Sequence, residues 1–378
     1  MAGTLTVDTI QSDSSYASTL NVASKINFTS GMQIGGQDTT FGGMRNRIIN
    51  GDMRINQRAS TGTPSIGAYT LDRYFYNANA TRITLSQSST APAGFANSMF
   101  VTSSSAASIA ASDYTNICQI IEGYNIADLA WGTADAKPVT LSFWVRSSVT
   151  GTFGGALRNA GGGGYWGYPF TYTINAANTW EYKTITIPGP TNVSYTWDST
   201  NAQGIYIWWD LGTGSTYTAP AGTWVNKNTV GADGTTKLVT TNAATWYMTG
   251  AQLEKGSVAS AFENRQYGTE LALCQRYFYL SNPSNASKTG GAWGSMYSGT
   301  TAHLNGPLPV AMRASPTFTF GGTSNTYYIS NINGASSGSP QNSASSPLIV
   351  DFEVISLSGG AIGYPVMYNG QLSITAEL

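Results

Sequence analysis

The chain has 378 residues, which is enough for two or three domains that each bury a core of their own. Only 10% of the residues are charged, against roughly 25% in an ordinary soluble protein, and the formal net charge is −1. A surface without a basic patch gives no electrostatic support for binding nucleic acid or an anionic membrane. We therefore expect no nucleic-acid partner and no membrane insertion.

The amino-terminal sequence, MAGTLTVDTIQSDSS, has no basic stretch followed by an apolar one. The sequence also lacks an apolar run of roughly 18 residues, the length that predicts a membrane span. We expect synthesis in a cytoplasm without a signal peptide. Cys118 and Cys274 lie far apart in the sequence, so they predict two buried thiols and no disulfide framework.

Residues 1–43 are poor in aromatic residues and rich in Ser, Thr and Gly. Short alternating runs, such as Leu5–Ile10 and Leu20–Phe28, predict strands that are too short to bury a core alone. We expect an extended β segment that mediates attachment or trimerisation, so that the protein is a homotrimer. The alternative is a disordered tail, which Ser-rich composition favours.

Residues 44–265 contain many short alternating runs divided by Gly, Pro, Asn and Asp, a pattern typical of a β-sandwich or jelly roll. The arginine-rich Asn46–Arg58, NRIINGDMRINQR, and Tyr69–Tyr76 predict its first strands. In Val139–Ser147, the alternate residues Val139, Leu141, Phe143 and Val145 should face the core. The other expected strands are Ile83–Ser86, Ser98–Thr102, Thr115–Ile121, Phe170–Ile174, Glu181–Ile187, Ile205–Leu211 and Trp246–Glu254.

Residues 266–280 are the exception, because Leu271, Cys274 and Phe278 have helical spacing and Thr269 is a plausible N-cap. This short helix would connect the jelly roll to a smaller carboxyl-terminal β-sandwich domain over residues 281–378. Its expected strands are Pro307–Met312, Thr317–Phe320, Tyr327–Ile329, Leu348–Ile355 and Gln371–Leu378. The predicted fold class is therefore all-β.

Catalytic chemistry has little support in the residue types present. His303 is the only histidine, which leaves serine or cysteine nucleophiles without a base and a zinc site without enough ligands. Asp198 and Asp210 flank several tryptophans, and two carboxylates can hydrolyse a glycoside. The simpler interpretation is two structural aspartates beside core tryptophans, and we expect no enzyme.

Sugar binding without cleavage makes better use of the aromatic residues. Tyr165, Trp166 and Tyr168 follow a run of glycines, and Tyr195 and Trp197 lie in a second loop. Aromatic rings stack on sugar faces, and a nearly neutral surface suits neutral glycans. We expect these five residues to bind a glycan; an intersubunit contact and packing within the subunit are the alternatives.

Several blocks together resemble a recurrent family of tail fibre and appendage structural proteins from tailed bacteriophages. They are NRIINGDMRINQR, YTLDRYFY, VTLSFWVRSSVTGTF, NTWEYKTITIPG and TWYMTGAQLEKGSVASAFENRQYGTELALCQRYF. The likeness covers roughly residues 44–320 and the last few, SITAEL. It implies a virion protein whose central domain resembles carbohydrate-binding-module jelly rolls.

The resemblance implies an adhesin that recognises the host cell surface through a glycan, with residues 1–43 contacting other virion proteins. The alternative is a non-adhesive head fibre, capsid decoration, connector or baseplate piece that acts in assembly. Jelly rolls of this kind often hold a structural calcium ion, for which Asn50, Asp52 and Glu254 are the candidate ligands. We expect no cofactor apart from this possible ion. A second interpretation pairs Asp52, Asp72, Glu254 and Glu263 with Arg47, Arg54, Arg73 and Arg265.

Overall fold

The chain divides into two units, Met1–Gly43 and Met44–Leu378. The computed structural model describes residues 33–34, 37–38, 44–161, 163–281, 292–329, 335–337, 339–342, 346–357 and 361–378. In the first unit, β1 (Gln33–Ile34) pairs with β2 (Gln37–Asp38) in antiparallel orientation. The strands expected at Leu5–Ile10 and Leu20–Phe28 lie outside the described residues, and trimerisation through residues 1–43 stays a prediction.

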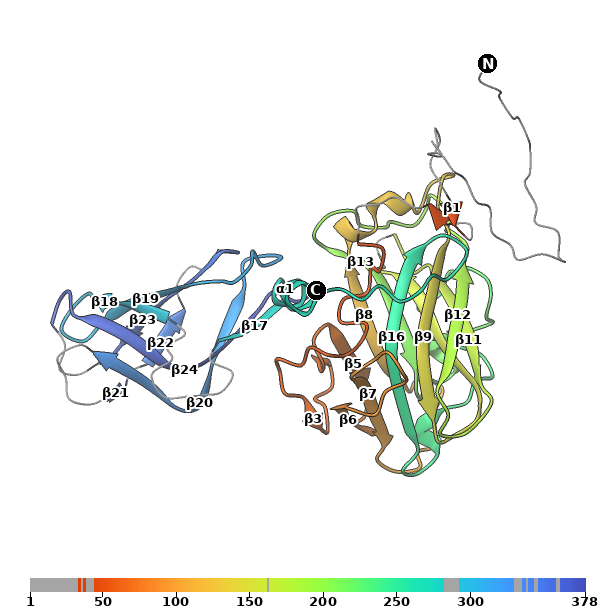
Figure 1. Ribbon diagram of the computed structural model, residues 1–378, viewed down its shortest axis with the longest axis horizontal. Helices are drawn as coiled ribbons and strands as arrows, with labels where there is room; N and C mark the ends of the chain where they lie inside the picture. Colours follow the sequence, from red (N-terminus) through yellow and green to blue (C-terminus); the bar gives the residue numbers. More distant parts are fainter. Residues whose placement is uncertain are drawn as a thin grey trace, which may run out of the picture. The chain divides into compact units, whose positions relative to one another are not determined.

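The second unit contains a sandwich of two six-stranded antiparallel sheets (Figure 1). The β13 sheet has the order β11-β10-β13-β8-β5-β4 and the β9 sheet has the order β12-β9-β16-β7-β6-β3. The strands of the β13 sheet are β4 (Ala68–Tyr69), β5 (Tyr74–Ala78), β8 (Thr115–Glu122), β10 (Gly151–Asn159), β11 (Gly167–Ile174) and β13 (Gln203–Asp210). Those of the β9 sheet are β3 (Thr61–Gly62), β6 (Ile83–Ser88), β7 (Ser98–Ser103), β9 (Val139–Ser147), β12 (Glu181–Ile187) and β16 (Thr245–Lys255).

Alternate residues of both sheets meet in one hydrophobic core. The predicted inward set of β9, Val139, Leu141, Phe143 and Val145, is fully buried. Phe143 meets Trp209 of β13 edge to face, with ring centroids 6.1 Å apart. The all-β class and the expected strands from residue 83 to residue 254 are confirmed.

Strand β10 was not predicted, because its sequence GTFGGALRN has glycines where alternation would need side chains. Gly155 shows why the strand needs a glycine at this position, because a methyl group there would lie 2.4 Å from the ring of Phe170 on the neighbouring β11. The glycine lets an aromatic ring of one strand cross the backbone of the next.

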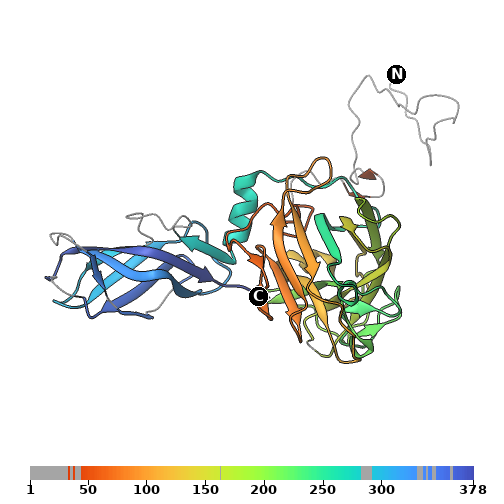
Figure 2. The same cartoon turned by 90° about the horizontal axis from the view of Figure 1, so that it is seen from below.

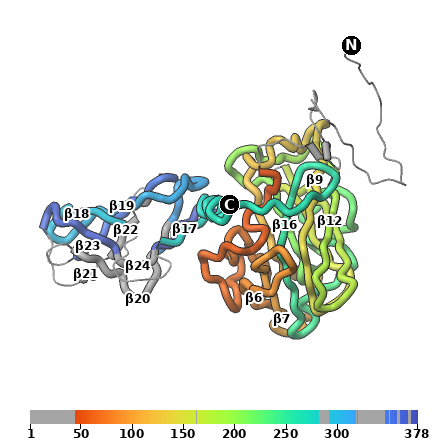
Figure 3. The backbone as a smooth tube through the Cα atoms, in the orientation of Figure 1, coloured from red at the N-terminus to blue at the C-terminus, as the bar shows by residue number. Residues whose placement is uncertain are grey.

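The prediction of a strand at Asn46–Arg58 is wrong. Residues 44–60, red to orange in Figure 3, are irregular, and Asn50 and Met53 both have a φ of 59°. The Asn50 amide donates to the carbonyl of Ile55 (2.8 Å) and accepts from its N–H (2.9 Å). This side chain thus replaces the ladder hydrogen bonds of a strand. Tyr69–Tyr76 also divides, into β4 and β5, at a turn where Arg73 has a φ of 72°.

The connection after β13 packs on the outer face of the β13 sheet, the face that points away from the core. It contains η3 (Ser215–Tyr217) and a parallel pair formed by β14 (Thr218–Ala219) and β15 (Gly231–Ala232). Its Tyr217 and Val230 join an apolar cluster with residues of β8, β10 and β13. Three further 3₁₀ turns are η1 (Gly123–Asn125), η2 (Ala127–Leu129) and η4 (Leu238–Thr240).

Helix α1 (Tyr267–Gln275) confirms the predicted helix, although it is shorter. Its N-cap is Gln266, in an extended conformation, and not Thr269, which lies inside the first turn. Cys118 and Cys274 are free and buried, as predicted. Among the described residues, no helix is long and apolar enough to cross a membrane.

The carboxyl-terminal strands, blue in Figure 2, form one eight-stranded sheet. It encloses a separate core that includes Phe352 and Tyr368. The strands are β17 (Phe278–Ser281), β18 (Ala292–Met296), β19 (Ala302–Pro307), β20 (Thr317–Ile329), β21 (Ala335–Ser337), β22 (Ser339–Asn342), β23 (Ile349–Ile355) and β24 (Pro365–Thr375).

Two expected strands of this sheet need correction. Pro307–Met312 is irregular after β19 ends at Pro307, because Pro307 and Pro309 have no N–H to donate to a ladder. The last strand ends at Thr375 and does not reach the carboxyl terminus. The final residues instead contact the sandwich, as described below.

Candidate functional site

The outer face of the β13 sheet carries a second apolar cluster. Neighbouring residues of β13 divide between the two faces: Trp209 is in the core, whereas Trp208 joins the outer cluster. The cluster comprises Cys118, Ile120, Ala156, Trp208 and Val230, with Phe75, Tyr206, Tyr217 and Leu378 packed against it. The connection after β13 and the end of the chain therefore cover parts of this face.

A small cavity, which we call the Trp208 pocket, lies under this cover and has a volume of about 170 Å³. Its lining combines aromatic, amide and guanidinium groups, contributed by Asn77, Tyr114, Arg158, Trp208, Tyr217, Asn228 and Val230. Tyr114 and Tyr217 meet edge to face at 5.5 Å. Among the described residues, the amides of Asn77 and Asn228 have no hydrogen-bond partner, so both are available to a ligand.

Arg158 is the charged group of the pocket and is only 7% exposed. Its guanidinium carbon lies 4.7, 5.1 and 5.8 Å from the ring centroids of Tyr165, Tyr206 and Trp208. Burial lowers the pKa of Arg158 below its ordinary value. Its Nε and Nη1 are covered without a hydrogen-bond partner, and no carboxylate pairs with it in the part of the chain that the structure describes.

A second cavity, the Gln203 pocket, has a volume of about 320 Å³. It is lined by Ala160, Thr196, Asp198, Ala202, Gln203, Arg313 and Leu378. The Tyr206 hydroxyl donates to Gln203 Oε1 (2.6 Å), and the Tyr206 ring stacks on Trp208 at 5.5 Å. Strand β13 thus connects the two pockets over about 17 Å, at roughly 3.3 Å per residue.

The two loops predicted to bind a glycan do come together. Trp166 stacks on Tyr195 with centroids 4.4 Å apart and an interplanar angle of 16°. Asn159 joins the loops, because its Nδ2 donates to the carbonyls of Gly164 (3.0 Å) and Thr196 (3.2 Å). Trp166 and Tyr195 therefore cover each other, which corresponds to the alternative of packing within the subunit.

The other three predicted residues have different surroundings. Tyr168 is buried, with its ring 5.3 Å from Trp224. Trp197 packs against both Trp131 (4.7 Å) and Trp224 (5.6 Å). Only Tyr165, which is 39% exposed and packs on Arg158, adjoins the Trp208 pocket. Sequence reasoning missed Arg158 and Tyr206, and it treated Trp208 as a core residue.

The two aspartates considered for glycoside hydrolysis have structural contacts. Asp198 Oδ1 accepts from the N–H (2.7 Å) and the hydroxyl (2.6 Å) of Thr200. Asp210 is fully buried and pairs with Lys237 at 2.5 Å. Burial raises the pKa of Asp210, and Lys237 opposes this shift. Asp198 lines the Gln203 pocket and Asp210 lines neither pocket, so neither of these two cavities has both carboxylates in its wall.

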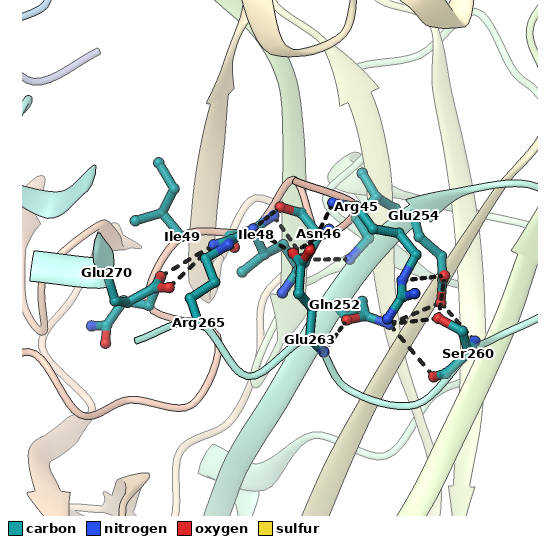
Figure 4. Close-up of polar contacts among 12 residues, drawn as sticks. Arg45, Asn46, Ile48, Ile49, Gln252, Glu254, Ser260, Glu263, Arg265 and Glu270 are labelled. Carbon is teal, nitrogen blue, oxygen red and sulfur yellow. Dashed lines mark hydrogen bonds and ion pairs between the residues drawn. The ribbon is translucent and has the colours of Figure 1, made fainter. Parts of the chain in front are cut away.

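The opening segment is fastened to the end of the sandwich by buried polar contacts (Figure 4). Asn46 Oδ1 accepts from the N–H groups of Ile48 (2.9 Å) and Leu253 (3.0 Å), and its Nδ2 donates to the carbonyl of Ala251 (3.1 Å). Arg265 pairs with Glu263 (3.1 Å) and Glu270 (3.2 Å). The structure brings the predicted acids and arginines together here, although several partners differ.

Most oxygens of the three calcium candidates already have protein donors. Both Glu254 oxygens accept from Ser260, at 2.8 Å from its N–H and 2.6 Å from its hydroxyl. Asp52 pairs with Arg54 at 2.6 Å, and Asn50 bonds the backbone as described above. The described residues contain no group of three or more His, Cys, Asp or Glu that could hold a metal ion. Calcium binding by Asn50, Asp52 and Glu254 stays a prediction without support from these contacts.

The last two residues of the chain bind the sandwich. Glu377 pairs with Arg73, which is 1% exposed, and with Arg58 at 2.9 Å. The guanidinium of Arg73 also lies 3.5 Å from the ring centroid of Tyr277. Burial alone would lower the pKa of Arg73, but Glu377 and the tyrosines raise it above its ordinary value. The Tyr69 hydroxyl donates to the carbonyl of Leu378 (3.2 Å), so strand β4 contacts the carboxyl terminus.

No family model and no curated protein matches the chain. Among solved structures, a putative sugar binding protein from Bacteroides thetaiotaomicron has a TM-score of 0.36 and 12% identity, over 56% of this chain and 100% of that one. The xylan-binding CBM22-2 domain from Paenibacillus barcinonensis has a TM-score of 0.29 and 15% identity, over 52% and 98%. The enzymatically active domain of bacteriophage CBA120 tailspike protein 4 has a TM-score of 0.29 and 12% identity, over 56% and 21%. At these scores the similarities assign no family to the chain.

Proposed function

We propose that the protein binds a glycan on the outer face of the β13 sheet, without cleaving it. The observation that carries the proposal is the Trp208 pocket, whose lining places Asn77 and Asn228 beside Trp208 and Tyr217. Sugar sites combine aromatic surface with a few polar groups that hydrogen-bond hydroxyls. The lining of the Trp208 pocket provides both. It contains no pair of carboxylates, which glycoside hydrolysis would need.

The sizes of the two pockets fit a short oligosaccharide. The Trp208 pocket, at about 170 Å³, equals the volume of roughly five or six waters in the liquid, enough for one sugar ring. The Gln203 pocket, at about 320 Å³, falls within the range of roughly 300–1,000 Å³ that is usual for ligand sites. Tyr206 lies between them on β13, so one chain of sugars can reach both pockets.

The biological setting that we propose follows from the sequence resemblance. The blocks from NRIINGDMRINQR to the α1 segment support a virion protein of a tailed bacteriophage, a tail fibre or appendage adhesin that recognises a host surface glycan. Residues 1–43 would then join copies of this chain and other virion proteins. A purified protein that neither binds host cells nor slows adsorption of the phage would favour the non-adhesive assembly role instead.

Glycan-array binding by the purified full chain tests the site. The double variant Asn77→Ala with Asn228→Ala should lose binding by about 10-fold or more, because each lost hydrogen bond is worth roughly 0.5–1.5 kcal/mol. Tyr182→Ala is the matched control, since Tyr182 is an exposed aromatic residue on β12 of the other sheet. The proposed location of the site would be contradicted if the double variant bound as tightly as the wild type, or if Tyr182→Ala lost as much binding as the double variant.

A further inference from the structure

Resting on the proposed glycan site, we infer that the Trp208 pocket selects an acidic sugar and that Arg158 binds its carboxylate. The ligand class would therefore be a glycan that contains a uronic acid or another carboxylated sugar. This differs from the neutral glycan that the overall charge of the chain predicts.

The first step is the missing partner of Arg158. Arg73, which is also buried, has the carboxylate of Glu377, and Arg265 has those of Glu263 and Glu270. Arg158 has no carboxylate among the described residues, although its side chain is almost fully covered. A buried charge without a counter-ion is costly to keep in a folded protein. An anion supplied by a ligand would remove that cost.

The second step is the geometry around the guanidinium. The rings of Tyr165, Tyr206 and Trp208 surround Arg158 and interact with its charge. Rings do not accept the in-plane hydrogen bonds of a guanidinium, and Nε and Nη1 have no acceptor. The aromatic surroundings hold the side chain in place, and Nε and Nη1 are left without an acceptor.

The third step is the identity of the anion. The seven residues that line the pocket include one cation and no acid, so the local charge favours an anion. A planar carboxylate matches the fork of a guanidinium. The amides of Asn77 and Asn228 next to it suit the hydroxyls of a sugar ring. The lining therefore fits a carboxylate carried on a sugar.

Matched glycan pairs test this inference with the full chain. Each uronic-acid oligosaccharide is compared with its carboxyl-reduced, neutral counterpart and with a phosphorylated neutral analogue, and the best binder is titrated by calorimetry. The wild type should bind the uronate about 10- to 100-fold more tightly than the reduced form, as expected for a hydrogen-bonded charge pair. Arg158→Gln should abolish this difference, and Arg158→Lys should keep part of it.

Arg146→Gln is the matched control, because Arg146 lies on β9 of the other sheet, where its Nε donates to the carbonyl of Asn178 (2.8 Å) and its guanidinium carbon lies 5.0 Å from the ring centroid of Tyr247. It should keep the wild-type preference. Equal affinity of the wild type for acidic and reduced glycans, or a preference for the phosphorylated analogue, overturns the inference and leaves the proposed function standing. Binding to none of the glycans overturns the proposed function itself. The wild-type comparison decides the matter even if Arg158→Gln is unstable.

Discussion

Glu377→Gln should destabilise the sandwich although Glu377 is the last residue but one. The substitution removes the charge that compensates Arg73, whose side chain is 1% exposed. Breaking a buried ion pair by removing one partner costs about 3–5 kcal/mol. The glutamine keeps one oxygen as an acceptor, so we expect about 3 kcal/mol for Glu377→Gln and more for Glu377→Ala. With about 2–4 °C per kcal/mol, the glutamine variant should melt roughly 6–12 °C lower.

Tryptophan fluorescence during chemical unfolding is a suitable assay. Nine of the ten tryptophans lie from Trp131 to Trp246 and the tenth, Trp293, lies in β18, so the signal reports mainly on the sandwich. Glu353→Gln is the control, because that carboxylate is 33% exposed and lies 3.9 Å from His303. Its cost should stay below about 1 kcal/mol. The reasoning is refuted if Glu377→Gln unfolds within about 0.5 kcal/mol of the wild type or of this control.

Three further predictions concern stability. Gly51→Ala should cost about 2 kcal/mol or more in urea unfolding, because its methyl group would lie 2.1 Å from a carbonyl oxygen of β16; Gly268→Ala, in open space on α1, should be neutral or stabilising. Asn46→Ala should cost at least about 2 kcal/mol in the same assay, since it orphans two buried N–H groups and a carbonyl; an unchanged midpoint would contradict the role of that side chain. Desolvation alone would raise the pKa of Glu181, but hydrogen bonds from Lys183 and nearby amides lower this pKa to about 2, which an NMR titration checks. Because the folded pKa lies below the unfolded value, Glu181 stabilises the protein above about pH 4.5 and this stability is lost towards pH 2, whereas Glu181→Gln should lose less over that range.

The sandwich strands were predictable because their cause is local. In β9, apolar residues at every second position fall on one face, whatever the rest of the chain does. The prediction of a strand at Asn46–Arg58 failed because the hydrogen bonds of this segment are not those of a β-ladder. Asn46 bonds Leu253, which is 207 residues away, and Asn50 bonds Ile55 within its own loop. Neither contact leaves a periodic pattern in the sequence.

The candidate site was predictable only in part, for a similar reason. Tyr165 lies beside the pocket, but whether an aromatic loop residue is free depends on what folds over it, and Trp166 and Tyr195 cover each other. Strand β13 has large apolar residues on both faces, so its sequence does not say which face is outside. Trp208 became part of a pocket because the connection after β13 folds over that outer face.

The contact between Arg73 and Glu377 also places a lower limit on how soon the protein can finish folding during synthesis. The two residues are separated by 304 positions in the chain. At about 5–20 residues per second, a ribosome needs roughly 15–60 s to make the intervening segment. During that time β5 and its neighbours exist without the carboxylate that neutralises the arginine in their turn. A turn that is translated near the start of the sandwich is thus among the last parts of the protein to be completed.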